Sequence, residues 1–600
     1  MAASKNYRGQ GRSGAAVAIL FLASAPGNSQ PFLFLSGIGG SSSAGSSRAE
    51  PWSIGLGETP GTGLGAGILR GRRFPTLLAS VGHGGQSNRD RETLGASWGT
   101  DRPQKSKRRR LGWGQVIPAS VRSVKRCGSG KVEPGALSGA AAGETAASAT
   151  GAHEETTSAD LCVDPSTEVD RVPSAGELLV KARDLYHKNF GQPKDVSHVC
   201  AGYAPGRVNL IGEHTDYNGG FVMPLALERG TVVYGVGRVV DVDSGSEAKG
   251  GLCQMVSESM LTDESGGSVS FQADELLVPG KPEWANYVKG VVKEFMVKVP
   301  AGKGLEYTAV ILGAVPIGGG VSSSASLTVA TATFLEGILS TEGITPPSPK
   351  EKAHMCRMAE HKFLNMPCGI MDQFVTAMAL PGHAMLLDCR SEEPDAVPLS
   401  DSNLVVIVTN SNVKHSLAGS EYPTRVAQCD KARDEVKKRH PDVDLLRDAT
   451  PEQVEEIKGH VEDAVFRRAR HVVSENARTV EAARALNDRD YPSAGRLMLE
   501  SHKSLREDYE VSCPEIDTLV ELAMEVEGVY GSRLTGGGFG GCTVTLADKD
   551  AVDGLVRHLQ EGYSRALGRE CSCFVTKPGF GARGLTGSEA STATMWPDSS

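Results

Sequence analysis

The pattern of apolar residues changes near residue 165, and this change sets the main limit on how the chain can fold. Residues 1 to about 165 show no sustained helical or strand periodicity, and stretches such as Gly61–Gly67 cannot bury enough apolar surface to offset the entropy of ordering. The residues that follow carry regular helical and strand patterns. We therefore predict a low-complexity, disordered basic extension over 1–165, followed by ordered domains that are long enough for a sizeable core.

Charge divides the chain in the same way. Residues 1–150 hold 19 Lys and Arg against 7 Asp and Glu, whereas the remaining residues hold 44 against 65. The basic run Lys105–Arg110 can bind RNA or an import receptor, but such a run is more often a solvated part of a tail. We expect no nucleic-acid binding by the acidic part of the chain.

Little in the sequence supports a membrane or secreted protein. No run approaches the roughly 18–20 apolar residues that span a bilayer. The apolar stretch Ala15–Ala25 resembles a signal peptide, with Ala23-Ser24-Ala25 as a cleavage site. A chance apolar patch is the favoured interpretation, because the 12 cysteines are sparse and include no CxxC pair, as in proteins with reduced thiols. We predict a cytoplasmic protein and a monomer.

Periodic patterns begin at Ser174, which forms an S-x-x-E capping box with Glu177. Strands are predicted at Thr231–Val236, Tyr307–Leu312, Ala384–Leu387, Leu404–Val408, Val529–Thr535 and Cys542–Ala547. Helices are predicted at Trp284–Val297, Ser322–Leu339, Lys350–Leu364, Thr424–Lys438, Ala464–Val473, Val480–Leu486, Tyr491–Asp508, Glu515–Val526 and Val552–Leu567. This mixture predicts an α+β fold with two domains, 166–390 and 391–580, and a disordered tail over 581–600.

A glycine–serine segment, Val315–Ser326, follows an apolar strand and opens a helix. Its three glycines, Gly318–Gly320, let the backbone approach an anion, and the first NH groups of the helix then point at that anion. A similar run at Gly39–Gly45 lacks both flanking elements, so we interpret that run as a linker. The sequence therefore predicts a phosphate-binding loop here, without a Walker lysine.

A second glycine-rich segment, Thr535–Gly541, contains a GxGxxG pattern. A strand follows it, whereas the dinucleotide-binding pattern opens a helix, so we reject a dinucleotide site. We predict a hairpin that brings backbone close to a ligand or to the first loop.

Two further segments carry polar groups that suit a sugar and a reaction centre. Arg207–Asn218 is dense in carboxylates and donors, which suits sugar hydroxyls as well as a solvated surface loop, and it lacks the second His or Cys of a typical zinc site. Asp372 lies within an otherwise apolar stretch, Met366–Phe374, so it needs a cationic partner, a helix-capping role or a function.

Together these segments resemble the galactokinases, a branch of the GHMP small-molecule kinase family. The resemblance covers residues 175–577, about two-thirds of the chain, with the three family motifs in order at Pro205–Asn218, Gly318–Ser326 and Thr535–Gly541. It implies an N-terminal domain like ribosomal protein S5 domain 2 and a ferredoxin-like C-terminal domain. It also implies transfer of the γ-phosphoryl group of ATP to the C1 hydroxyl of α-D-galactose.

The resemblance also assigns roles to residues. It implies that Arg207 and Asp372 are the catalytic pair and that Arg207, Glu213, His214, Asp216, Asp372 and Tyr422 line the sugar. It implies that ATP is held by Gly318, Gly320, Ser322 and Ser323 at the phosphates and by Trp284 and Tyr287 at the adenine. It implies Mg²⁺ binding by Ser324 and Glu360.

Two alternatives fit the same motifs less well. An N-acetylgalactosamine kinase shares the first motif but needs space near the C2 of the sugar, and the uninterrupted CGIMDQF at 368–374 resembles galactokinases better. A galactose-sensing regulator without catalysis lacks residues after the glycines of the second motif, whereas Ser322–Ser326 is complete here.

Overall fold

The computed structural model describes residues 172–242, 251–263, 265–274, 276–413, 421–592 and 596, and the short strands β1 (Phe21–Ala23) and β2 (Phe32–Phe34). The chain separates into two compact units, Met1–Glu144 and Thr145–Ser600. In the first unit, β1 and β2 pair antiparallel. The basic run Lys105–Arg110 and the rest of the predicted extension, apart from β1 and β2, lie outside the described residues.

A six-stranded sheet forms the first layer of the second unit, in the order β15-β3-β5-β8-β6-β7. All neighbours are antiparallel except β6 and β8, which are parallel. Its strands are β3 (Val199–Asn209), β5 (Pro224–Asp241), β6 (Gly251–Ser257), β7 (Ser268–Ala273), β8 (Lys303–Gly313) and β15 (Arg583–Thr586).

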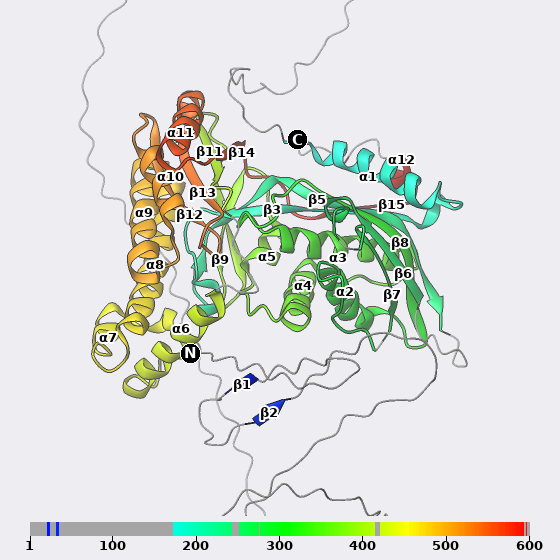
Figure 1. Cartoon of the computed structure of the whole chain (residues 1–600), viewed down its shortest axis with the longest axis horizontal. Helices are drawn as coiled ribbons and strands as arrows, with labels where there is room; N and C mark the ends of the chain where they lie inside the picture. Colours follow the sequence, from blue (N-terminus) through cyan, green and yellow to red (C-terminus); the bar gives the residue numbers. More distant parts are fainter. Residues whose placement is uncertain are drawn as a thin grey trace, which may run out of the picture. The chain divides into compact units, whose positions relative to one another are not determined.

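Helices cover both faces of this sheet (Figure 1). One face carries α1 (Ala175–Phe190) and α12 (Gly587–Thr592), and the other carries α2 (Ala285–Phe295), α3 (Ser323–Thr341), α4 (Pro349–Leu364) and α5 (Met371–Met378). Coverage on both sides explains why every residue of β3 is buried. The capping box predicted at Ser174 and Glu177 is confirmed at the start of α1.

Close packing between β3 and α3 fixes the start of α3 relative to the sheet. A Cβ atom on Gly202 would overlap the backbone of Ala330, so only glycine lets the helix lie this near the strand. Ser326, in the first turn of α3, donates through Oγ to the carbonyl oxygen of Ala204 at 2.8 Å. The N-terminus of α3 is thereby held beside the end of β3.

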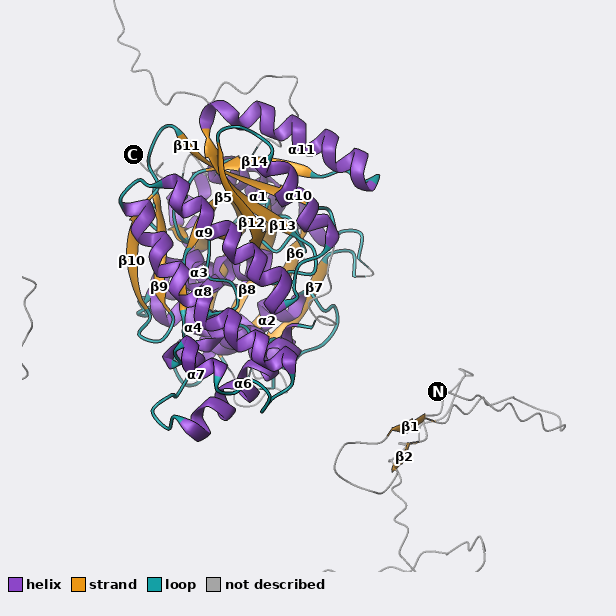
Figure 2. Ribbon diagram, turned by 90° about the vertical axis from the view of Figure 1, so that its left-hand side faces the viewer, coloured by secondary structure: helices purple, strands orange, loops and turns teal. Residues whose placement is uncertain are grey.

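A four-stranded antiparallel sheet forms the second layer, in the order β12-β13-β11-β14. Its strands are β11 (Leu404–Asn410), β12 (Val529–Thr535), β13 (Cys542–Asp548) and β14 (Ser572–Thr576). Alternate residues of β11 face opposite sides, so Val405 packs with α10 (Pro514–Met524) and α11 (Val552–Leu567), whereas Val406 packs with α8 (Asp463–Asn487) and α9 (Tyr491–Ser504). The four helices and the strands are labelled in Figure 2.

The remaining elements complete the second unit. A small sheet has the order β10-β9-β4 and consists of β4 (Phe221–Val222), β9 (His383–Asp388) and β10 (Glu393–Pro398). The β9–β10 hairpin surrounds residue 390, where the sequence predicts the domain boundary. Two more helices are α6 (Tyr422–Arg439) and α7 (Pro451–Glu455), and α9 continues as a π-helical turn over Leu505–Tyr509. Within the described ranges, no helix combines the length and apolar character needed to cross a membrane.

Two predictions are corrected. The helices predicted at Ala464–Val473 and Val480–Leu486 form one helix, α8, because Glu475 and Thr479 between them are buried with hydrogen-bond partners instead of ending the helix. The disordered tail predicted at 581–600 is wrong for the described residues there. β15 pairs with the edge of β3, α12 follows it, and Trp596 is buried beside Tyr203. A four-residue edge strand is too short to give a periodic signal.

Candidate active site

A cavity of about 440 Å³ in the second unit contains the candidate site. Every residue that the sequence predicts for the site lines this cavity: Arg207, Glu213, His214, Asp216, Trp284, Tyr287, Gly318, Gly320, Ser322, Ser323, Ser324, Glu360, Asp372 and Tyr422. These residues come from β3, α2, α3, α4, α5, α6 and the loops beside them. The fold therefore brings together three motifs, of which the first and the last lie more than 300 residues apart in the chain.

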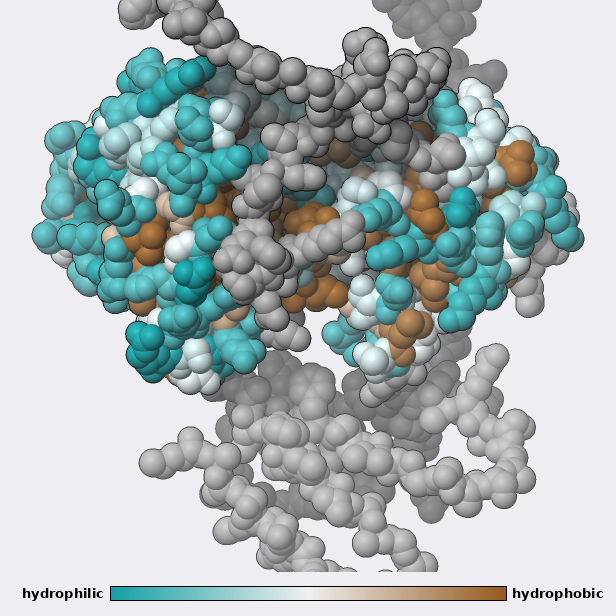
Figure 3. Space-filling model, turned by 90° about the horizontal axis from the view of Figure 1, so that it is seen from above, coloured by the Kyte–Doolittle hydropathy of each residue, from teal (hydrophilic) through white to brown (hydrophobic). Residues whose placement is uncertain are grey.

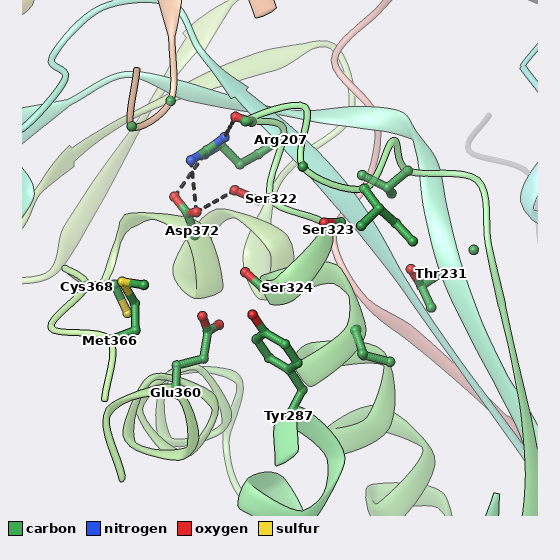
Figure 4. Close-up of a pocket in the computed structure, with 18 of the residues that line it drawn as sticks. Arg207, Thr231, Tyr287, Ser322, Ser323, Ser324, Glu360, Met366, Cys368 and Asp372 are labelled. Atoms are coloured by element: carbon green, nitrogen blue, oxygen red, sulfur yellow. Dashed lines mark hydrogen bonds and ion pairs between the residues drawn. The ribbon is translucent and has the colours of Figure 1, made fainter. Parts of the chain in front are cut away.

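Arg207 and Asp372 form a two-point ion pair at the centre of the cavity (Figure 4). Arg207 Nε lies 2.8 Å from Asp372 Oδ1, and Nη2 lies 2.8 Å from Oδ2. The third nitrogen, Nη1, donates to the carbonyl oxygen of Gly320 at 2.7 Å. Asp372 lies in the first turn of α5, where the helix dipole favours a negative charge. The cationic partner expected for Asp372 is thus Arg207.

The glycine–serine loop joins β8 to α3 and curves around the same point. Gly318 and Gly320 have φ of 78° and 72°, and Ser322 has a left-handed φ of 60°. Ser322 donates through Oγ to Asp372 Oδ2 and leaves the first NH groups of α3 without a side-chain cap. The helix N-terminus therefore presents unpaired donors and a positive dipole end at the cavity, which suits an anion such as phosphate.

The third motif forms the turn between β12 and β13 and packs directly on the phosphate loop. A Cβ atom on Gly536 would overlap the carbonyl oxygen of Gly320, and Gly536 itself has φ of 86°. The predicted close approach of this hairpin to the first loop is confirmed. Substitution of Gly536 by any other residue would separate the two loops.

His214 is a neutral group that faces the cavity. Its φ of 63° turns the chain sharply after Glu213. Its Nδ1 lies 2.9 Å from the hydroxyl of Tyr217, whereas its Nε2 is buried and has no hydrogen-bond partner among the described residues. Burial holds the pKa of His214 well below its usual value. A neutral imidazole with one free ring nitrogen is suited to a ligand hydroxyl.

Asp216 lies against Gly369 and near Asp372. Burial, and then the charge of Asp372, raise the pKa of Asp216 to about 6. A Cβ atom on Gly369 would overlap the Asp216 carboxylate, so the glycine in the segment 366–374 makes room for that carboxylate. Asp216 is therefore an acceptor whose charge is costly until a donor reaches it.

Glu213 lines the cavity, but protein groups already occupy its carboxylate. Oε1 accepts from the backbone NH of Gly536 at 2.7 Å, and Oε2 accepts from Arg533 Nη1 at 2.8 Å and from Asn209 Nδ2 at 2.5 Å. The resemblance implies a sugar ligand at this position. In the structure Glu213 lines the cavity and also connects the loop after β3 to the hairpin of the third motif.

Ser324 and Glu360 lie on facing helices, α3 and α4, with their oxygens toward one another (Figure 4). Glu360 Oε1 accepts from Gln373 Nε2 at 2.9 Å, and burial, despite the hydrogen bond from Gln373, raises the pKa of Glu360 to about 7. A buried carboxylate beside a hydroxyl fits a hard cation such as Mg²⁺. No group of three or more His, Cys, Asp or Glu that could hold a metal ion occurs among the described residues.

Part of the cavity lining is aromatic or aliphatic. Trp284 and Tyr287 stand at the start of α2, and the indole Nε1 of Trp284 is buried without a hydrogen-bond partner among the described residues. The lining also includes Met260, Ile311, Val315 and Leu327. An aromatic and aliphatic surface with one free donor suits a planar heterocycle.

Sequence reasoning missed the buried residues that hold the site together. Asn209 and Arg533 contact Glu213, and Gly369 accommodates Asp216. Arg533 carries a signal that was available, since it is a single charge in the strand VYGSRLT, as Asp372 is in its own segment. Asn209 and Gly369 carry none, because neither an asparagine at the end of a strand nor a glycine in a loop is unusual.

Comparisons with known proteins agree with this geometry. Three family models match the chain: the galactokinase galactose-binding signature at 184–235, the GHMP kinases N terminal domain at 286–379 and the GHMP kinases C terminal at 482–565. Galactokinase from Homo sapiens is 50% identical over 396 residues, 66% of this chain and 94% of that protein. Galactokinase from Clostridium acetobutylicum is 40% identical over 384 residues, 64% of this chain and 93% of that protein.

A solved structure gives the same result. The crystal structure of Lactococcus lactis galactokinase complexed with galactose matches with a TM-score of 0.60 and 30% identity, and the match covers 67% of this chain and 98% of that one. The two-layer α+β architecture and the resemblance in the motifs are thereby confirmed. On the identity, the coverage and the three matching family models, this chain belongs to the galactokinase family of GHMP kinases.

Proposed function

We propose that this protein is an ATP-dependent kinase that transfers the γ-phosphoryl group of ATP to the C1 hydroxyl of α-D-galactose, giving galactose 1-phosphate and ADP. The observation that carries this proposal is the position of the Arg207–Asp372 pair. The pair lies between the polar loop 213–216 and the phosphate loop, and Arg207 touches both Asp372 and Gly320. A base and a cation are therefore placed where an acceptor hydroxyl and a phosphoryl group meet.

The sugar is held on the polar side of the cavity. His214 offers Nε2, Asp216 offers a carboxylate, and Tyr422 closes the cavity near His214, with their ring centroids 5.6 Å apart. Glu213 supports this loop through its contacts with Arg533 and Gly536. Charge-assisted hydrogen bonds from sugar hydroxyls to Asp216 offset the desolvation of its carboxylate.

Phosphoryl transfer then depends mainly on positioning and on charge stabilisation. Asp372 accepts the proton of the C1 hydroxyl as the new O–P bond forms, and the bond from the γ-phosphorus to the bridging oxygen of ADP breaks. Arg207 stabilises negative charge on the transferring group while it holds Asp372 in place. Both roles use nitrogen atoms of one planar guanidinium.

The nucleotide occupies the other side. Gly318, Gly320, Ser322 and Ser323 contact the phosphates through backbone NH and hydroxyl groups, and Trp284 and Tyr287 contact the adenine. Ser324 and Glu360 hold Mg²⁺, which supplies positive charge to the triphosphate when bound. Because carboxylates also line the cavity, these backbone NH and hydroxyl donors are needed to hold the negatively charged phosphates.

We also propose that the enzyme is cytoplasmic and monomeric, that it uses domains 166–390 and 391–580, and that its kinase core binds neither nucleic acid nor membrane. The ten cysteines within the described residues are free thiols, which suits a reducing compartment. Light scattering on the purified chain tests the oligomeric state.

The decisive experiment is an assay of the full-length chain with ATP, Mg²⁺ and either galactose or N-acetylgalactosamine. We expect ATP-dependent formation of galactose 1-phosphate and a higher kcat/KM for galactose. A preference for the N-acetyl sugar would assign the chain to the other kinase class. Absence of any phosphorylated sugar would leave only a sensing role.

A further inference from the structure

A buried ionic cluster lies behind the sugar side of the cavity, and Arg533 is at its centre. Arg533 is on β12, and its side chain is 0% exposed. It meets two carboxylates: Nη1 lies 2.8 Å from Glu213 Oε2, and Nη2 lies 3.7 Å from Glu475 Oε1. Burying a guanidinium between two carboxylates costs desolvation free energy, and well-packed apolar side chains often give equal stability. Such a cluster therefore suggests a role that an apolar side chain cannot fill.

Glu475 has other partners besides Arg533, although the charge of Arg533, after that of Arg478, also lowers the pKa of Glu475. Arg478 Nε lies 2.9 Å from Glu475 Oε2, while the NH of Gly212 and the hydroxyl of Ser501 donate to Oε1 at 2.9 and 2.5 Å. With these donors, and Arg533 farther away, burial does not prevent ionisation, and the pKa of Glu475 falls to about 2. Removal of Arg533 would therefore leave Glu475 paired.

Arg533 is the main cation that acts on Glu213, and the charge of Arg207 acts on it more weakly. Among the described residues the one ion pair of Glu213 is with Arg533, and its other donors, Asn209 Nδ2, Gly536 NH and Thr535 Oγ1, are neutral. Its side chain is 2% exposed, so solvent cannot replace the guanidinium. Without Arg533, Glu213 must bind a proton or admit water, and either change weakens its hold on Asn209 and Gly536.

The contacts of Glu213 reach both substrate sites. Its backbone leads directly into His214 and Asp216, and its carbonyl oxygen lies 3.1 Å from His471 Nε2. Its side chain holds the NH of Gly536, which packs against the carbonyl oxygen of Gly320 in the phosphate loop. A shift of the Glu213 carboxylate would therefore move the sugar-binding loop and the phosphate loop together.

We propose that Arg533 is a positioning residue of this kinase, and that it neutralises Glu213 so that one buried carboxylate holds the sugar-binding loop and the phosphate loop in register. The proposal rests on the proposed function, because it concerns the alignment of the two substrates. Arg533 does not line the cavity. It donates to Glu213 and to the backbone carbonyl of Asn209, and it also lies 3.7 Å from Glu475.

The test compares four variants with the full-length wild type: Arg533→Met, Glu213→Gln, the double variant, and Arg533→Lys. Lys352→Met is the matched control. Lys352 is also buried, and its Nζ lies 2.8 Å from Glu336 Oε2, but neither residue lines the cavity. KM for galactose, KM for ATP, kcat and Tm are measured for each protein. Wild-type turnover on galactose is recorded first, so that failure of the proposed function is separated from failure of this inference.

We expect Arg533→Met to raise KM for both galactose and ATP at least tenfold and to lower kcat, with a smaller effect for Arg533→Lys. The double variant should recover at least half of the lost kcat/KM on a logarithmic scale, because a neutral Gln needs no cation and keeps an acceptor for Gly536. Lys352→Met should lower Tm without changing either KM. If Arg533→Met does not fold, the same comparison is made with Arg533→Lys, with and without Glu213→Gln.

Two results would overturn the inference. One is an unchanged pair of KM values in the Arg533 variant that is tested. The other is strictly additive losses in the double variant, since additivity would mean that Arg533 contributes only to the stability of the fold and not through the charge of Glu213.

Discussion

The guanidinium of Arg207 holds both carboxylate oxygens of Asp372, at 2.8 Å each, and donates through its remaining nitrogen to the carbonyl of Gly320. This arrangement uses all three guanidinium nitrogens, so neither Lys nor His can replace Arg207 without losing a contact. It also fixes the distance between the proton acceptor and the phosphate loop. The base and the phosphate-binding loop therefore move as one rigid group.

Asp372→Asn should retain galactose binding and lose most turnover. Asn has the shape of Asp and can still accept from Arg207, but it cannot accept the proton of the C1 hydroxyl. General-base catalysis contributes about 10²–10⁴-fold, so kcat should fall by that order while galactose affinity, measured by calorimetry, stays within a few fold. Asp395→Asn on the exposed strand β10 is the control. Near-normal turnover in Asp372→Asn would mean that Asp372 only orients the hydroxyl.

Asp216→Asn should weaken galactose binding but stabilise the free protein above pH 6. Loss of a charge-assisted acceptor should cost about 1.5–3 kcal/mol of binding free energy, measured by calorimetry. The pKa of Asp216 is raised to about 6 in the folded state, so the folded state binds a proton that the unfolded state releases, and stability falls as pH rises from about 4 to 6. The Asn variant escapes this loss.

Urea unfolding at two pH values checks the second half of that prediction. At pH 7.5 the Asp216→Asn variant should be more stable than wild type by up to about 3 kcal/mol, and near pH 4 the difference should vanish. If the variant and wild type differed in unfolding free energy by the same amount at both pH values, the charge of Asp216 would not be what lowers the stability of the ligand-free protein. Unchanged galactose affinity would remove Asp216 from the sugar site.

Gly369→Ala should weaken galactose binding by displacing the side chain of Asp216. A Cβ atom on Gly369 would overlap the Asp216 carboxylate, so that carboxylate must move away from its position beside Asp372. We expect KM for galactose to rise about tenfold or more while KM for ATP changes little. Gly554→Ala is the control, because Gly554 lies in α11 with open space around its Cβ position. Equal KM values for the two variants would contradict the packing argument.

Strong periodicity predicted the fold well where one face of an element is apolar. α2 and α11 begin and end within two residues of their predicted bounds. Strand β3 was not predicted, because its residues VCAGYAPGRVN are small or polar and the strand is buried on both faces, so it shows no alternation. α5 was missed as well, since eight residues give too few turns for a helical pattern.

The candidate site, like the fold, could be predicted only in part from the sequence. The site residues were predicted through the resemblance of the motifs to those of galactokinases, and all of them line one cavity. Their supports were not predicted, because a contact such as Arg533 with Glu213 joins residues 320 positions apart and depends on tertiary packing. Figure 3 shows apolar patches among polar side chains on one face of the molecule, another arrangement that a linear pattern does not give.

Removal of residues 1–160 should leave kinase activity intact. Every residue that lines the cavity lies between Arg207 and Gly537, and the first helix of the second unit has its own cap at Ser174. We expect kcat and both KM values of the shortened chain to lie within about twofold of the full-length values. Loss of soluble enzyme would show that the segment supports the folded kinase.

Glu360→Gln should raise the Mg²⁺ concentration needed for half-maximal turnover about tenfold or more, because it removes the charged oxygen that faces Ser324. The pKa of Glu360 is raised to about 7, so below pH 7 the ion must displace a proton, and in wild type the half-saturating Mg²⁺ concentration should rise up to about tenfold per pH unit. Binding of Mn²⁺ followed by electron paramagnetic resonance gives a readout that is independent of turnover. The control is Glu336→Gln, a substitution of another glutamate with a raised pKa that lies outside the cavity. Equal Mg²⁺ requirements for wild type and Glu360→Gln, with unchanged Mn²⁺ binding, would remove Glu360 from the metal site.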